Sequence, residues 1–161
     1  DGYTSLCIAS YKGHVEVVRL LLSKSDIDIN RAEEEGCTAL YTASQKGHVE
    51  VVQLLLQDTH ILVNQAQEDG CQPTHAAASF GHIEILRLLL QQPNIEYNTE
   101  DSYGKTPEAW AKEKGHTKIV RLLQQHTTTG TAQHQEGETK TSSNSNNNKK
   151  RNKKKNKKKK K

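Results

Sequence analysis

Apolar residues recur along the chain in short blocks that share one layout. The blocks read VEVVRLLL from residue 15, VEVVQLLL from 49, IEILRLLL from 83 and TKIVRLLQ from 117, so that each begins 34 residues after the last. In the second block Val49, Val52 and Leu56 fall on one side of a helix, with Val51 and Leu55 beside them. So wide an apolar stripe must face neighbouring helices. We therefore expect a helix from about Val49 to Leu56, and similar helices in the other three blocks.

A shorter helix is predicted ahead of each block. In the example TALYTAS from residue 38, Thr38 is a good N-cap, the alanines allow close packing, and Gly47 can end the helix in a left-handed conformation. After the second helix, about fourteen residues with an alternating element (Ile27-Asp28-Ile29) and acidic turn residues lead to the next unit. Two glycine series keep the same 34-residue interval: Gly13-His14, Gly47-His48, Gly81-His82 and Gly115-His116, and Gly2, Gly36, Gly70 and Gly104.

Four units in register predict a repeat array. Their approximate boundaries are 1–35, 36–69, 70–103 and 104–126, and residues 127–161 lie outside the pattern. Tetratricopeptide repeats have the same period, but they consist of two long helices with little connection between them. The apolar stretches here span only about two turns each, and the connecting segment has no helical period. This layout excludes tetratricopeptide repeats.

The units resemble the ankyrin-repeat family in their sequence motifs as well as in their layout. The family's Thr-Pro-Leu-His tetrapeptide corresponds to Thr4-Ser5-Leu6-Cys7, Thr38-Ala39-Leu40-Tyr41, Gln72-Pro73-Thr74-His75 and Thr106-Pro107-Glu108-Ala109, and the Val-Asn ending to Ile29-Asn30, Val63-Asn64 and Tyr97-Asn98. The resemblance covers residues 1–126. It implies an all-α repeat solenoid of stacked helix-turn-helix units with β-turn finger loops. It also implies a non-catalytic scaffold, in which His75 hydrogen-bonds backbone between repeats.

The turn after the second helix departs from the family. Where the family has glycine, alignment from the Val-Asn ending places Asp26, His60 and Asn94, each preceded by one extra residue. Asp, His and Asn are the non-glycine residues that best tolerate the left-handed conformation. We therefore predict a positive φ, or a slightly looser turn, at these three positions.

The two ends of the array differ. Lys112, Lys114, Lys118 and Gln124-Gln125 give the fourth unit a polar surface, as a terminal repeat requires. The first unit begins in the middle of the motif and shows no polar capping face, from which we expect further repeats ahead of Asp1.

Charge distinguishes the array from the C-terminal residues after it. Residues 1–126 hold 11 Lys and Arg against 17 Asp and Glu, a net of −6, whereas residues 127–161 hold 12 against 2, a net of +10. The repeat pattern stops at Thr127 and no apolar residue follows Ala132, which predicts that residues 127–161, rich in Ser and Asn and then in Lys, are disordered. The final basic run could act as a nuclear import signal, bind nucleic acid or anionic lipid weakly, or have no selected role. Its basic residues are Lys149, Lys150, Arg151, Lys153, Lys154, Lys155, Lys157, Lys158, Lys159, Lys160 and Lys161.

Catalysis is not indicated. The four histidines of the Gly-His pairs would lie roughly 10 Å apart in stacked units, whereas zinc needs ligands about 2 Å away. We therefore interpret each of them as a polar residue at the start of a second helix. Cys7, Cys37 and Cys71 fit neither a disulfide framework nor a zinc site, which indicates reduced thiols. No phosphate-binding glycine loop is present, and no apolar run approaches the length of a membrane span. We expect no enzyme activity and no metal or cofactor. We also expect the protein to be an intracellular monomer, located in the cytoplasm or the nucleus.

If the family's binding mode carries over, the partner is a protein that contacts the fingertips and the exposed side of the first helices. Tyr11 and Phe80 are the preferred anchors, although either ring could pack between repeats instead. Glu33-Glu34-Glu35, Glu68-Asp69 and Glu100-Asp101 are expected to form a ladder of negative charge at the fingertips. This ladder is either an ordinary solvated loop or a docking strip for a basic partner, including the chain's own basic run. The implied contact residues are Tyr3, Tyr11, Lys12, Glu34, Glu35, Cys37, Gln45, Lys46, Glu68, Asp69, Cys71, Ser79, Phe80, Tyr103, Lys105, Glu113 and Lys114.

Overall fold

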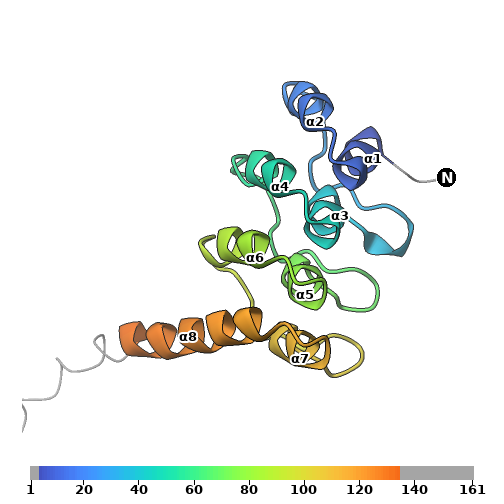
Figure 1. Cartoon of the computed structure of the whole chain (residues 1–161). Coiled ribbons are helices and arrows are strands. Elements are labelled where there is room, and N and C mark those ends of the chain that lie inside the picture. Colours follow the sequence, from blue (N-terminus) through green and yellow to red (C-terminus); the bar gives the residue numbers. More distant parts are fainter. Residues whose placement is uncertain (1–3, 135–161) are drawn as a thin grey trace, which may run out of the picture.

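The computed structural model describes the backbone of residues 4–134 and the side chains up to Thr127. In this part of the chain, eight α-helices form two columns (Figure 1). The odd-numbered helices stack on one another, the even-numbered helices stack beside them, and looped fingers project from the odd-numbered column. The helices are α1 Ser5–Lys12, α2 Val15–Leu22, α3 Ala39–Lys46, α4 Val49–Leu55, α5 Pro73–Ser79, α6 Ile83–Leu90, α7 Pro107–Glu113 and α8 Thr117–His134, with a 3₁₀ turn, η1, at Glu34–Gly36.

Local chemistry sets the ends of the first helices. The Thr4, Thr38 and Thr106 hydroxyls each accept a hydrogen bond from the backbone N–H three residues later. In α5 the N-cap is Gln72, whose N–H donates to His75 Nδ1 at 3.2 Å. Because Nδ1 accepts this bond, Nε2 carries the proton and donates to the Thr99 carbonyl at 3.1 Å. His75 thus bonds backbone as expected, but both partners lie in its own unit, 70–103, and not in a neighbouring repeat. Burial lowers the pKa of its imidazole, which favours this neutral form.

The core lies between the columns. Val51, Ile85 and Ile119, which occupy equivalent positions in α4, α6 and α8, are at most 1% exposed. Equivalent leucines of the same three helices are buried beside them. The predicted apolar stripe therefore packs into one continuous core that runs through all four units.

A histidine joins each repeat to the one before it. The Nε2–H groups of His48, His82 and His116 donate to the carbonyls of Tyr11, Gln45 and Ser79 at 2.9, 3.0 and 3.1 Å. Each imidazole also covers the glycine that ends the preceding first helix, so that a Cβ there would lie 2.6–2.8 Å from the ring. The sequence predicted only a polar residue at the start of each second helix. The structure shows that this side chain does not cap its own helix but bonds the neighbouring unit.

The fingers carry further bonds between repeats. Asn30 donates through Nδ2 to the His60 carbonyl at 2.8 Å and accepts from the Leu62 N–H at 2.8 Å. Asn64 makes the same pair of bonds in the next repeat. At the fingertips the Glu68 N–H donates to the Glu35 carbonyl at 3.0 Å, and Ser102 to Asp69 at 2.8 Å. The asparagine of the Val-Asn ending therefore links adjacent fingers.

A positive φ, one of the two forms predicted for the turn after the second helix, is found at one position of three. Asn94 has φ 59°, but Asp26 and His60 do not adopt positive φ. At His60, the Asp58 carboxylate accepts from the His60 N–H at 2.9 Å, and this side-chain turn replaces the left-handed residue. Nothing in the structure explains why Asp26 does not adopt a positive φ. Glu35, at the second fingertip, is left-handed with φ 70° and was not predicted.

The last helix continues beyond the predicted end of the array. The boundary at residue 126 falls inside α8, which runs to His134. Once a helix is nucleated, each further residue adds one hydrogen bond, so extension costs far less than initiation. The Thr127 hydroxyl also bonds back to the Leu123 carbonyl at 3.0 Å. Disorder was predicted for residues 127–161, but residues 127–134 belong to this helix. The rest of that prediction, for residues 135–161, lies outside the described residues.

Two glycines allow the histidine contact to be separated from backbone strain. Gly47 and Gly115 have similar left-handed φ values of 82° and 77°, but a Cβ at Gly47 would lie 2.6 Å from the His82 ring, whereas one at Gly115 meets nothing within 4 Å. We expect Gly115→Ala to lower the free energy of unfolding by about 1–2 kcal/mol through strain alone. Gly47→Ala should cost a further ~1–3 kcal/mol through overpacking. Equal losses in urea denaturation would contradict the histidine contact.

Candidate protein-binding surface

The predicted contact residues fall on two stripes of the odd-numbered column and its fingers. The helix-end stripe comprises Tyr11, Lys12, Gln45, Lys46, Ser79, Phe80, Glu113 and Lys114, at the C-terminal ends of α1, α3, α5 and α7. The fingertip stripe comprises Glu34, Glu35, Cys37, Glu68, Asp69, Tyr103 and Lys105. Of these fifteen residues, ten are exposed and five (Cys37, Gln45, Asp69, Ser79 and Lys105) are half-buried.

Two aromatic side chains project from the helix-end stripe. Tyr11 is 49% exposed and Phe80 is 54% exposed, so neither ring packs between repeats. The Lys46 ammonium lies 4.4 Å from the Tyr11 ring centroid, a cation–π contact between adjacent units. Phe80 stacks on His82, with 6.5 Å between the ring centroids and an angle of 9° between the planes. Both rings are therefore held in place by neighbours yet keep about half of their surface open.

The fingertip stripe is acidic and unneutralised. Glu34, Glu35 and Glu68 are exposed, and none of them takes part in any salt bridge found among the described residues. The backbone bonds between fingertips fix the spacing of these carboxylates from one repeat to the next. Of the acidic ladder predicted from the sequence, Glu34, Glu35 and Glu68 thus form a row of free carboxylates, whereas Asp101 is buried.

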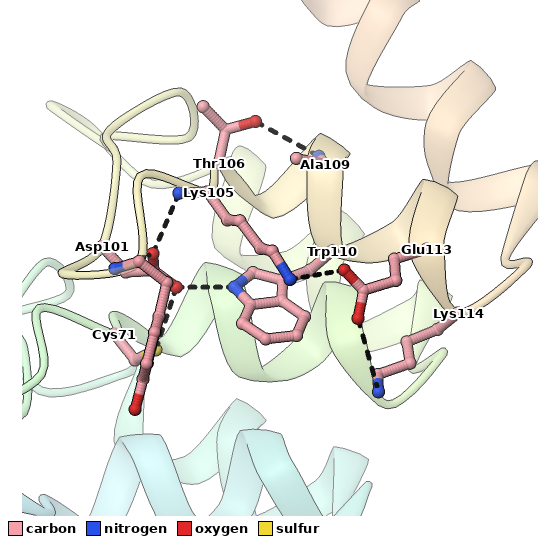
Figure 2. A network of polar contacts seen from close by, with 9 residues as sticks. Cys71, Asp101, Lys105, Thr106, Ala109, Trp110, Glu113 and Lys114 are labelled. Carbon is pink, nitrogen blue, oxygen red and sulfur yellow. Dashed lines mark hydrogen bonds and ion pairs between the residues drawn. The ribbon is translucent and has the colours of Figure 1, made fainter.

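In the fourth repeat the two stripes meet. Lys105 of the finger forms a salt bridge with Glu113 at the end of α7, and its ammonium lies 4.0 Å from the centroid of the Trp110 ring (Figure 2). Lys114 approaches the same carboxylate at 3.9 Å. Tyr103, 68% exposed, meets Trp110 edge-on at 6.4 Å between centroids. This cluster presents one exposed phenol on a base of paired charges.

A buried carboxylate supports the cluster from below. Asp101 Oδ2 accepts from Trp110 Nε1 at 2.6 Å and from the Cys71 thiol at 3.6 Å, while Oδ1 accepts from the Tyr103 and Lys105 N–H groups, both at 2.9 Å (Figure 2). Burial alone would raise the pKa of Asp101, but these hydrogen bonds outweigh it and hold the pKa below its ordinary value. The ionised carboxylate therefore fixes both the fingertip and the indole.

The placement of Cys71 corrects one expectation. Its side chain is buried beneath the fourth finger, so it is not a surface contact residue. Its thiol donates to the carboxylate of Asp101 in the next finger at 3.6 Å. Burial is the main cause that raises the pKa of Cys71 to about 12, and it does the same for Cys7. Both thiols are thus protonated near neutral pH and weak as nucleophiles.

Several predicted residues lie outside the described part of the chain. These are Tyr3 and the whole basic run from Lys149 to Lys161. Within the side chains that are described, no group of three or more His, Cys, Asp and Glu could hold a metal ion. None of the helices in residues 4–134 is long and apolar enough to cross a membrane.

Sequence reasoning missed Trp110 as part of this surface. It is the single tryptophan of the chain, at a position where the other units have Ile8, Thr42 and Ala76. The change from a small or aliphatic side chain to tryptophan was the sequence signal that could have identified this position. Its partner Asp101 was grouped with the acidic fingertips, because sequence alone does not show that its carboxylate turns inward.

The Asp101 network can be tested without touching the exposed stripes. Asp101→Asn replaces one acceptor oxygen by an NH₂ group that faces donors, and we expect a loss of about 2–4 kcal/mol in the free energy of unfolding. The fluorescence of Trp110 should shift as its indole loses its acceptor. The neighbouring exposed carboxylate supplies a control, since Glu100→Gln should change stability by less than about 0.5 kcal/mol. Similar small effects for both variants would show that Asp101 is not a structural acceptor.

Comparison with known proteins agrees with this architecture. The family model described as "Ankyrin repeats (3 copies)" matches residues 1–67 and again residues 57–134. No curated protein matches the chain. The two matches together cover residues 1–134, which is more than half of the 161 residues and includes all four helix pairs. The chain belongs to the ankyrin-repeat family.

Proposed function

We propose that this chain binds a protein partner through the helix-end stripe and the fingertip stripe together, without catalysing a reaction. The observation that carries the proposal is the exposure of three aromatic rings, Tyr11, Phe80 and Tyr103, on these stripes. Large aromatic side chains held by neighbours but open to solvent lose little entropy on binding and are frequent hot spots. Ankyrin repeats generally mediate protein–protein interaction, which supports the same proposal.

The charges indicate what the partner presents. The free carboxylates of Glu34, Glu35 and Glu68 favour basic side chains along the fingertips. Lys12 and Lys46 form no salt bridge in the described structure, so they favour acidic groups along the helix ends. A partner segment with an apolar anchor, basic on one side and acidic on the other, fits both stripes. Association should therefore slow as salt is added.

The other function expected from the sequence is binding of nucleic acid by the basic run. Eleven of the last thirteen residues are Lys or Arg, but they lie outside the described residues. That function stays a prediction.

Single substitutions at exposed rings test the protein-binding proposal. Peptides selected from a random library on the full chain at about 0.5 M salt, where simple charge attraction is screened, provide the probe. Phe80→Ala should weaken their binding at least about tenfold, because a central anchor is lost. Leu62→Ala is the matched control, since Leu62 is 57% exposed but lies in the turn after α4, away from both stripes. Calorimetry showing equal affinity for the wild type and Phe80→Ala, or equal losses for both variants, would refute the assignment.

A further inference from the structure

The outward side of the first repeat carries exposed apolar side chains that the other repeats bury. Val17 is 47% exposed, whereas its equivalents Val51, Ile85 and Ile119 are 0%, 0% and 1% exposed. Ile119 belongs to the last unit and has no following repeat, so it is the preceding repeat that covers this position. Ile8 (44%) and Leu20 (63%) follow the same trend, because their counterparts Thr42 and Ala76 are buried and Leu54, Leu88 and Leu122 are half-buried.

The same face carries a histidine without its usual contact. His48, His82 and His116 each bond a carbonyl and cover a glycine of the preceding repeat. His14 occupies the equivalent position, is exposed and makes no such bond in the described structure. We call Ile8, His14, Val17 and Leu20 the N-terminal face. Its side chains correspond to those that face the preceding repeat at the three junctions inside the array. At those junctions such a face packs against the preceding helix pair.

The opposite end of the array has a different chemistry. Positions that are buried by the next repeat as Leu6, Leu40 and Thr74, or as Ser10, Ser44 and Ala78, become Glu108 and Lys112 in the fourth repeat. Lys112 pairs with Glu108 at 2.7 Å, and Gln124 donates to the same carboxylate at 2.8 Å. These paired polar groups need water, so they make a poor surface for stacking. Among the described residues, the array therefore presents paired charges at this end and exposed apolar side chains at the other.

From this asymmetry we infer that the N-terminal face is a docking surface for one more helix pair of the ankyrin type, oriented as the four in the structure are. Such a helix pair buries the three apolar side chains and brings to His14 a glycine and a free carbonyl at the end of its first helix. A second copy of this chain offers Gly115 and the end of α7 through its polar end, but there the three apolar side chains would face the paired charges of Glu108 and Lys112. Two N-terminal faces placed against each other would leave both histidines without an acceptor.

The chain contains its own probe for this surface. A second copy of residues 36–69 placed directly ahead of Gly2, in the otherwise complete chain, continues the 34-residue register. We expect the added helix pair to fold on the N-terminal face. The thermal midpoint of unfolding should rise by at least about 5 °C. Amide exchange in α2 should slow at least about tenfold, because opening this end would then require the new junction to break.

The control is the pair of substitutions Val17→Glu and Leu20→Glu. In the unextended chain both side chains are exposed, so the midpoint should stay within about 2 °C of the wild type. In the extended chain the same pair should abolish the gain in midpoint and in exchange protection. A gain that survives the substitutions, or an added repeat that exchanges as an unfolded segment, would overturn the proposal. So would an unextended chain that sediments as a dimer and becomes monomeric on substitution, since the occupant would then be a second copy.

Discussion

The structure depends on one contact between repeats. In it, the histidine at the start of a second helix bonds the last turn of the first helix of the preceding repeat. In the first three repeats both helices have only seven or eight residues, which is too short to be stable alone in water. Stability therefore comes from burial between units. The imidazoles of His48, His82 and His116 fit only because glycine ends the helix that they cover, and each ring then bonds a carbonyl that the helix leaves free.

The binding stripes depend on the same junctions. Tyr11, Gln45 and Ser79, whose carbonyls accept the histidine bonds, are themselves residues of the helix-end stripe. Stacking thus sets the positions of the exposed rings and charges as well as the core. In the fingers, the backbone bonds between tips and the inward-facing Asp101 hold a second row of side chains at matching intervals. A rigid surface of this kind loses little conformational entropy on binding.

The sequence predicted what repeats, and it predicted less well what differs between repeats. The helix pairs, the threonine caps and the glycines that follow the first helices were predicted from a pattern that recurs every 34 residues, whereas the backbone bonding of His75 was expected from the resemblance to ankyrin repeats. The inward turn of Cys71 and Asp101, and the bonding of the junction histidines, depend on the adjacent finger or helix and have no local signal. Positive φ appeared at Asn94 but not at His60, because a hydrogen bond to Asp58 provided another turn. A helix that has already formed is also extended easily, which is why α8 passes the boundary expected at residue 126.

Unfolding of two histidine variants of the complete chain tests the role of the junction contact most directly. His82→Leu keeps a similar volume but removes the bond to the Gln45 carbonyl, whereas His14→Leu changes the equivalent residue where no such bond exists in the described structure. Urea denaturation should show a loss of about 1–2 kcal/mol in the free energy of unfolding for His82→Leu. For His14→Leu the change should be below about 0.5 kcal/mol. Equal losses, or no loss at His82, would contradict a structural role for the junction histidines.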